Sequence, residues 1–79
     1  MPQPATHEDL LEALRAVPGL VERGKRPGTF YRRSRPFLHF HGSGDARTAD
    51  LRRGDGWQRL PAATPADRAA LLAAVEARA

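Results

Sequence analysis

The sequence contains no cysteine and no isoleucine, a single lysine, and only five aromatic residues among its 79. Without cysteine the chain can form neither a disulfide framework nor a thiolate metal site. No apolar run is long enough to span a membrane, and the N-terminus lacks the basic-then-apolar pattern of a signal peptide. We therefore expect a soluble cytoplasmic protein with no membrane partner.

Large apolar side chains are also scarce, which limits the core. Alanine supplies 14 residues, whereas Leu, Val, Phe, Trp and Tyr together supply only 17. A chain of this length buries about 60 % of the surface that it exposes when unfolded, so its stability margin is narrow. The sequence predicts a single domain over residues 1–79, with residues 1–5 disordered. Self-association as a homodimer is one way to cover a leftover apolar face.

Positive charge is concentrated in the middle of the chain. Residues 23–59 contain ten Arg or Lys against three Asp, a charge of +7, while the whole chain carries +4. Twelve of the 13 basic residues are Arg, whose planar guanidinium suits phosphate and carboxylate recognition. A GC-rich coding bias would give the same preference, so the position of the charges is more informative than their type. The basic middle segment points to an anionic partner.

Two predicted helices flank this middle segment. The first begins at Thr6, with two acids in its first turn, and ends at Pro18 and Gly19. The second has Thr64 as its N-cap and Pro65 at its first helical position. Apolar side chains at helical spacing form one stripe on each helix: Leu10, Leu11, Leu14 and Val17 on the first, and Leu71, Leu72 and Val75 on the second.

Between the helices the apolar pattern has a period of two, which is typical of β-strands, and glycine turns separate the segments. We expect short antiparallel strands over residues 20–22, 29–33, 36–41, 47–52 and 57–60. The predicted fold class is α+β: an N-terminal helix, an antiparallel meander of four to five short strands and a C-terminal helix. Both helices would cover one face of the sheet, in a two-layer sandwich.

Alternation along the two central strands assigns their side chains to two faces. Leu38, Phe40, Ala49 and Leu51 are expected to face the helices. The outer face would then carry Phe37, His39, His41, Thr48, Asp50 and Arg52.

The two histidines of this outer face lie about 6–7 Å apart along the strand. His39 and His41 can share a zinc or copper ion at that spacing, with Asp50 of the next strand as a third ligand. Exposed strand histidines without another His or Cys nearby in the sequence are more typical of a solvated face. We therefore predict no metal and no cofactor.

No residue is predicted to be catalytic. Ser34 lies in a basic bend, and Ser43 lies in a glycine turn that lacks the spacing of a nucleophile elbow. The loop over residues 24–28 is too short for a phosphate loop and lacks the following Ser or Thr. His39 and Asp50 would make an acid–base pair on geometry alone. We favour a protein that is not an enzyme.

A basic sheet with aromatic side chains suits single-stranded RNA or DNA, because aromatic rings stack on bases and arginines bind phosphates. Tyr31 and Phe37 are the candidate stacking platforms. The RNA-binding aromatic motif is missing, however, and a smaller anion or an acidic protein surface would use the same side chains. The candidate anion-binding residues are Arg32, Arg33, Arg35, Phe37, His39, His41, Arg52 and Arg53.

The order of the segments over residues 10–75 resembles two groups of small bacterial α+β domains. The resemblance rests on Pro18–Glu22 after the first helix, on Phe37–His41, on the strand that contains Asp50, and on Trp57. One group is the MmcQ/YjbR family, often labelled DNA-binding, and the other is named luciferase-like. This chain is shorter than typical members and lacks the helical segment that usually follows the His-containing strand. The resemblance implies the fold and supplies no catalytic residue.

The sequence therefore predicts a small binding module for an anionic partner, with nucleic acid as the leading candidate. The alternative is an accessory domain that self-associates or docks on another protein and has no nucleic-acid role. In that case the arginines would serve solubility and the protection of sheet edges.

Overall fold

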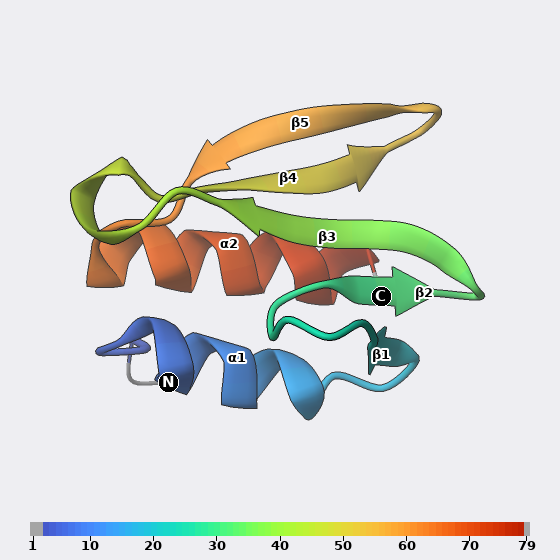
Figure 1. The fold of residues 1–79 in the computed structure, drawn as a ribbon, viewed down its shortest axis with the longest axis horizontal. Helices are drawn as coiled ribbons and strands as arrows, with labels where there is room; N and C mark the ends of the chain where they lie inside the picture. Colours follow the sequence, from blue (N-terminus) through green and yellow to red (C-terminus); the bar gives the residue numbers. More distant parts are fainter. Residues whose placement is uncertain (1–2, 79) are drawn as a thin grey trace.

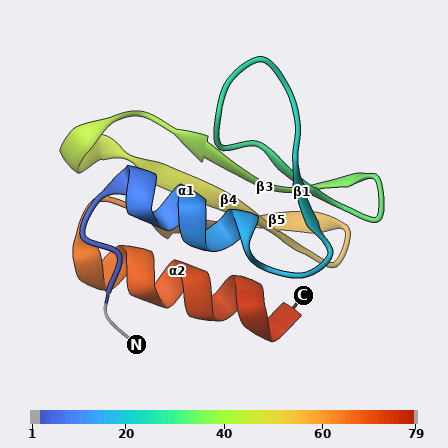
Figure 2. The same cartoon turned by 90° about the horizontal axis from the view of Figure 1, so that it is seen from below.

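Two helices lie side by side against one face of a five-stranded antiparallel sheet (Figures 1 and 2). The computed structural model describes residues 3–78, and none of the helices in that range is long and apolar enough to cross a bilayer. The order of the strands in the sheet is their order in the sequence, so the predicted helix–meander–helix α+β fold is confirmed. The elements are α1 (His7–Arg15), β1 (Leu20–Glu22), β2 (Phe30–Arg32), β3 (Arg35–His41), a 3-10 turn (Gly44–Ala46), β4 (Thr48–Arg53), β5 (Gly56–Pro61) and α2 (Pro65–Arg78).

Both predicted helix starts are confirmed by their capping hydrogen bonds. The hydroxyl of Thr6 accepts the N–H of Asp9 at 3.0 Å, which satisfies one of the free donors of the first turn of α1. At the start of α2 the hydroxyl of Thr64 accepts the N–H of Asp67 at 3.0 Å. The carboxylate of Asp67 in turn accepts the N–H of Thr64 at 3.1 Å, so the two residues form a reciprocal capping box.

The core lies between the helices and the sheet, as the alternation predicts. Leu38, Ala49 and Leu51 are buried, each with at most 1 % of its surface exposed. Phe40 is partly buried and packs against this core, with its ring 4.8 Å from that of His7 in an edge-to-face contact. The other buried side chains of the cluster include Leu10, Leu11, Leu14, Phe30, Leu71, Leu72 and Val75.

Phe37 departs from the alternation, and the prediction of an exposed ring on the outer face is wrong. Its residue surface is only 5 % exposed, and it belongs to the hydrophobic core cluster. The cause is a β-bulge: Phe30 pairs with Leu38 and Tyr31 pairs with Pro36, which leaves Phe37 without a partner in β2. An extra residue in one strand breaks the period of two, so positions before and after the bulge no longer alternate in phase.

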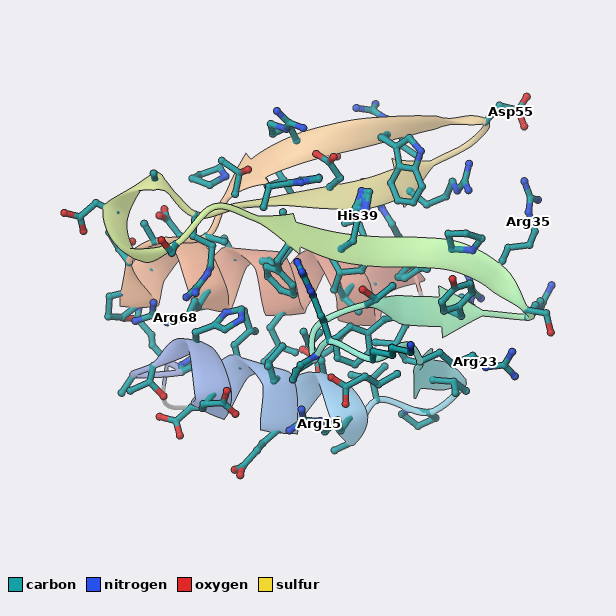
Figure 3. All side chains as sticks on the ribbon, in the orientation of Figure 1. Arg15, Arg23, Arg35, His39, Asp55 and Arg68 are labelled. Carbon is teal, nitrogen blue, oxygen red and sulfur yellow. The ribbon has the colours of Figure 1, made fainter. Side chains whose placement is uncertain are left out.

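Arg68 of α2 is buried beneath the start of the chain (Figure 3), with 7 % of its surface exposed. Its Nε donates to the carbonyl of Pro4 at 2.9 Å, and its Nη2 donates to the carbonyl of Ala5 at 2.7 Å. A third bond runs from Nη1 to the carbonyl of Ala63 at 3.1 Å. Of the segment predicted to be disordered, residues 1 and 2 lie outside the described residues. Pro4 and Ala5 are held in place by this one side chain.

Candidate anion-binding site

Six arginines surround a pocket of about 460 Å³ at the end of the sheet that carries the β2–β3 and β4–β5 turns. Within the described range, 3–78, no carboxylate contributes to the lining of this pocket. We call it the arginine pocket. Its lining residues are Arg32, Arg33, Arg35, Pro36, Phe37, Arg52, Arg53, Gly54 and Arg78.

The meander explains why arginines that are distant in the sequence meet here. Because the strands are antiparallel, the end of β2, the start of β3 and the end of β4 lie at the same end of the sheet. The helix α2 also ends there (Figure 1). Arg35 extends from this end of the sheet (Figure 3). Arg33, Arg35 and Arg53 are exposed, whereas Arg32, Arg52 and Arg78 are half-buried. The pocket thus combines fixed and solvent-facing cations.

Arg52 and Arg78 are held by uncharged groups. Nε of Arg52 donates to the carbonyl of Pro36 at 3.1 Å. Arg78 donates to the carbonyl of Arg52 at 3.2 Å and to the side-chain oxygen of Gln58 at 3.0 Å. The guanidinium of Arg32 lies over the buried ring of Phe37, 5.9 Å from its centroid. The carbonyl and amide partners of Arg52 and Arg78 orient these two cations without neutralising them, so both contribute positive charge to the pocket.

The β2–β3 turn supplies part of the wall in a strained conformation. Arg33 and Ser34 both have positive φ, at 53° and 66°. A two-residue hairpin turn with positive φ at both central positions favours Asn-Gly, because larger side chains clash with the backbone there. Non-glycine residues in this region cost about 1–3 kcal/mol each, and such strain is often found at functional sites.

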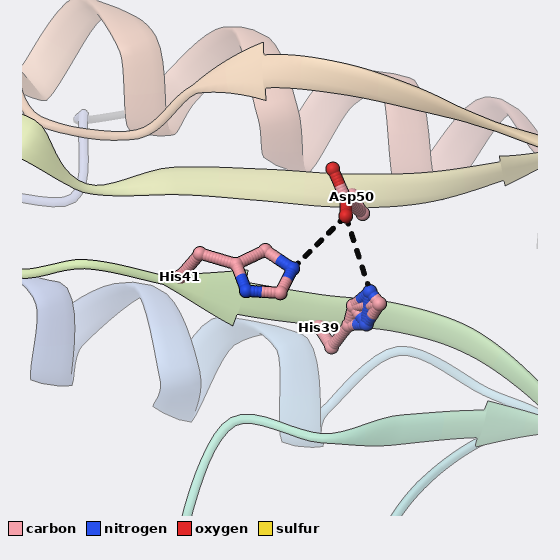
Figure 4. A group of neighbouring side chains, drawn as sticks. All are labelled: His39, His41 and Asp50. Atoms are coloured by element: carbon pink, nitrogen blue, oxygen red, sulfur yellow. Dashed lines mark hydrogen bonds and ion pairs between the residues drawn. The ribbon is translucent and has the colours of Figure 1, made fainter.

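A second group of polar side chains lies on the outer face of the sheet, where β3, β4 and β5 run side by side. Oδ2 of Asp50 lies 2.9 Å from Nε2 of His41 and 3.3 Å from Nε2 of His39 (Figure 4). Arg59 of β5 binds the same carboxylate through two bonds, Nε to Oδ1 at 2.9 Å and Nη2 to Oδ2 at 3.1 Å. We call these four residues, His39, His41, Asp50 and Arg59, the carboxylate cluster.

Trp57 covers one side of the carboxylate cluster. Its ring stacks on His39, with the centroids 4.7 Å apart and the planes at 13°. The guanidinium of Arg52 lies 4.3 Å from the centroid of the indole. Asp50 is only 8 % exposed, whereas His41 beside it is exposed to solvent.

The carboxylate cluster is arranged to keep Asp50 ionised. Hydrogen bonds from Arg59, and then from His41, lower the pKa of Asp50 to about 2. Burial, with the positive charge of His41 as a second cause, lowers the pKa of His39. A neutral His39 and a negative Asp50 therefore coexist near pH 7, and each imidazole that donates to Oδ2 carries its proton on Nε2.

The structure divides the predicted site residues between two places. The arginines at 32, 33, 35, 52 and 53 and the ring of Phe37 come together in the arginine pocket, whereas His39 and His41 belong to the carboxylate cluster. Sequence reasoning missed Arg59, although alternation places it on the same face as Trp57 and opposite Asp50. It also missed Arg78, for which the sequence carries no signal, since only the packing of α2 against the sheet brings it to the pocket.

No family model matches this chain, and neither the curated proteins nor the solved structures contain a match. The resemblance to the MmcQ/YjbR and luciferase-like groups stays a prediction.

Proposed function

We propose that this protein is a binding module for an anionic partner that carries phosphate groups, with single-stranded nucleic acid as the leading candidate. The observation that carries the proposal is the arginine pocket, which is lined by six arginines and by no Asp or Glu among residues 3–78. A guanidinium binds phosphate oxygens through paired N–H donors, and its affinity increases where neighbouring cations add to the field.

We expect the arginine pocket to bind the phosphates of a nucleic acid and not its bases. Phe37 is buried, and Trp57 already contacts His39 and Arg52. Tyr31 is half-buried, with the guanidinium of Arg23 at 5.9 Å from its ring centroid. Because the aromatic platforms are engaged within the fold, we expect recognition to depend on the number of phosphates and to vary little with sequence.

The strained turn gives independent support. Arg33 occupies a position where Asn would fold more stably, yet its side chain lines the arginine pocket. A strained, positively charged residue at a pocket wall fits a role in binding a ligand.

Removing three exposed pocket arginines should weaken binding specifically. The triple variant Arg33→Gln, Arg35→Gln, Arg53→Gln lowers the charge by three without touching the core. Its affinity for a single-stranded oligonucleotide should fall, and the slope of log affinity against log salt should decrease in magnitude by about 2, since about 0.7 counterions are released per phosphate contacted. Fluorescence anisotropy of a labelled oligonucleotide, measured from about 50 to 200 mM salt, follows both quantities.

A matched control removes the same charge elsewhere. Arg23, Lys25 and Arg26 lie in the β1–β2 loop and do not line the arginine pocket. Their triple substitution by Gln should change the salt slope much less than the pocket variant. Equal losses in both variants would show that net charge alone drives binding. Undetectable binding of the unmodified protein at micromolar concentration and about 50 mM salt would overturn the proposal.

The turn itself offers a test that separates folding from binding. The double variant Arg33→Asn, Ser34→Gly should raise the free energy of unfolding by about 1–2 kcal/mol, because it relieves the positive-φ strain. It should nevertheless bind the oligonucleotide more weakly, since one pocket arginine is lost. Urea denaturation followed by circular dichroism, together with anisotropy, measures both effects.

The single variant Ser34→Gly is the control for this experiment. It should gain stability and keep its affinity, because Ser34 does not line the arginine pocket. A double variant that is more stable and binds as tightly as the unmodified protein would exclude Arg33 from the ligand contact.

The alternative of self-association has less support in the structure. Among residues 3–78, the exposed large hydrophobic side chains are Val21 and Trp57, at 48 % and 41 % exposure. They lie on β1 and β5, at opposite edges of the sheet, and so do not form one apolar patch. A homodimer stays a prediction that sedimentation analysis can test.

A further inference from the structure

Two imidazole nitrogens and one carboxylate oxygen of the carboxylate cluster lie close together. His39 and His41 leave β3 two residues apart, and both direct Nε2 toward Oδ2 of Asp50 on β4 (Figure 4). The register explains this, because His39 is directly opposite Asp50 and His41 is the next residue of β3 on the same face. Two imidazoles and one carboxylate are a ligand set that divalent transition metals use widely in proteins.

Two of the separations between these atoms, those from each histidine to Asp50, are close to the ligand–ligand distance of a tetrahedral metal site. Zinc binds imidazole nitrogen and carboxylate oxygen at about 2.0–2.2 Å, so two ligands in a tetrahedral site are about 3.3 Å apart. The distances to Oδ2 are 3.3 Å from His39 and 2.9 Å from His41, and one ligand atom from each of the three residues lies within 4.8 Å of the others. An ion can therefore enter with small side-chain rotations.

The surroundings hold the ligands in place without blocking access to them. The imidazole of His39 is fixed by stacking on Trp57 and by an edge contact with His41, whose ring centroid is 4.7 Å away. Side-chain exposure is 33 % for His39 and 49 % for His41, so an ion can approach from solvent. Metal ligands that are held by packing and open to solvent on one side are typical of sites that keep one coordination position for water or substrate.

Arg59 is the competing cation, and its geometry allows it to remain beside a bound metal. Its Nε bonds Oδ1 of Asp50, whereas only Nη2 reaches Oδ2. A metal on Oδ2 displaces Nη2 and leaves the Nε bond, which then orients the carboxylate as an outer partner. The side chain of Arg59 is 63 % exposed and free to make that rotation.

We propose that His39, His41 and Asp50 bind a divalent transition metal ion, with Zn²⁺ the best match to the ligand set. The ligand atoms are Nε2 of each histidine and Oδ2 of Asp50, with the fourth position open to solvent. The site lies on the outer face of the sheet, and none of its three ligand residues lines the arginine pocket. Coordination uses the Nε2 lone pairs, so each neutral imidazole then carries its proton on Nδ1.

Titration of the tag-free protein with zinc chloride at pH 7.5 tests the site, with imidazole ¹⁵N NMR and calorimetry as readouts. We expect one Zn²⁺ per chain and a shift of the His39 and His41 signals to those of the Nδ1–H tautomer. His7 contacts Phe40 and lies outside the ligand set, so its signals should stay unchanged. No shift at a several-fold molar excess of Zn²⁺, or an equal shift of His7, would overturn the proposal.

Variants distinguish coordination from a nonspecific effect of zinc. His41→Ala removes a ligand with a half-exposed side chain, and should weaken Zn²⁺ binding at least about 10-fold while circular dichroism shows an intact fold. His39→Gln provides a second ligand variant should the first unfold. His7→Phe removes the other histidine of the chain and should bind Zn²⁺ as the unmodified protein does. Unchanged affinity in both ligand variants would refute the assignment, and no part of this test depends on an anionic ligand.

Discussion

Replacing Phe30 with alanine is expected to lower the free energy of unfolding by about 3–5 kcal/mol, a large part of the total stability of a domain of this size. The side chain is fully buried, and it lies on β2, which is only three residues long. Few other apolar groups hold this strand against the helices. The cavity left by the ring would therefore add to the lost burial of apolar surface. Urea denaturation followed by circular dichroism measures the change.

Val21 is the matched control for this substitution. Val21 lies on β1, opposite Tyr31 of β2, and 48 % of its surface is exposed. Val21→Ala should change the free energy of unfolding by no more than about 0.5 kcal/mol. A loss below about 1 kcal/mol for Phe30→Ala would mean that the core closes around the cavity, and that β2 depends less on this ring than its burial indicates.

Replacing Arg68 with methionine should cost about 2–3 kcal/mol of unfolding free energy, the second large effect that we expect. The guanidinium donates to three carbonyls, those of Pro4, Ala5 and Ala63. Methionine fills a similar volume and removes a buried charge, but it leaves these acceptors without a donor. Leaving buried acceptors unpaired costs about 1–3 kcal/mol. Hydrogen exchange of the first turn of α1 should quicken, because its anchor is lost.

Arg68→Lys separates charge from shape in the same position. An ammonium keeps the positive charge but cannot reach three separate carbonyls with the geometry of the guanidinium fork, so most of the loss should persist. Arg26→Met, in the exposed β1–β2 loop, is the control and should be close to neutral. If Arg68→Met were equally neutral, water would have to satisfy the carbonyls in place of the side chain.

The fold could be predicted from the sequence because local signals and the global arrangement agree. Thr6 and Thr64 announce the two helices through their capping chemistry, and glycine turns separate segments that alternate with a period of two. Phe37 could not be placed in this way. A β-bulge inserts one residue into the count, and nothing in the local sequence distinguishes that residue from its neighbours.

The candidate sites were predicted in part. Alternation correctly grouped His39, His41 and Asp50 on one face, since all three lie in strands with regular pairing. It could not show that the arginines of the β2–β3 turn lie at a pocket completed by Arg78, because that pocket joins the middle of the chain to the end of α2, more than 40 residues away. The burial of Arg68 was missed for the same reason, since its partners at positions 4 and 5 are more than 60 residues away.

Trp57 lies where the two proposed sites meet, since its indole contacts Arg52 of the arginine pocket and His39 of the carboxylate cluster. It is the sole tryptophan of the chain, and 41 % of its surface is exposed. Its intrinsic fluorescence is therefore a native reporter for both sites, with emission that responds to movement of the guanidinium on one side and of the imidazole on the other. Ligand binding at either site can therefore be followed without a label. The effect of one ligand on the binding of the other can be measured from the same tryptophan emission band.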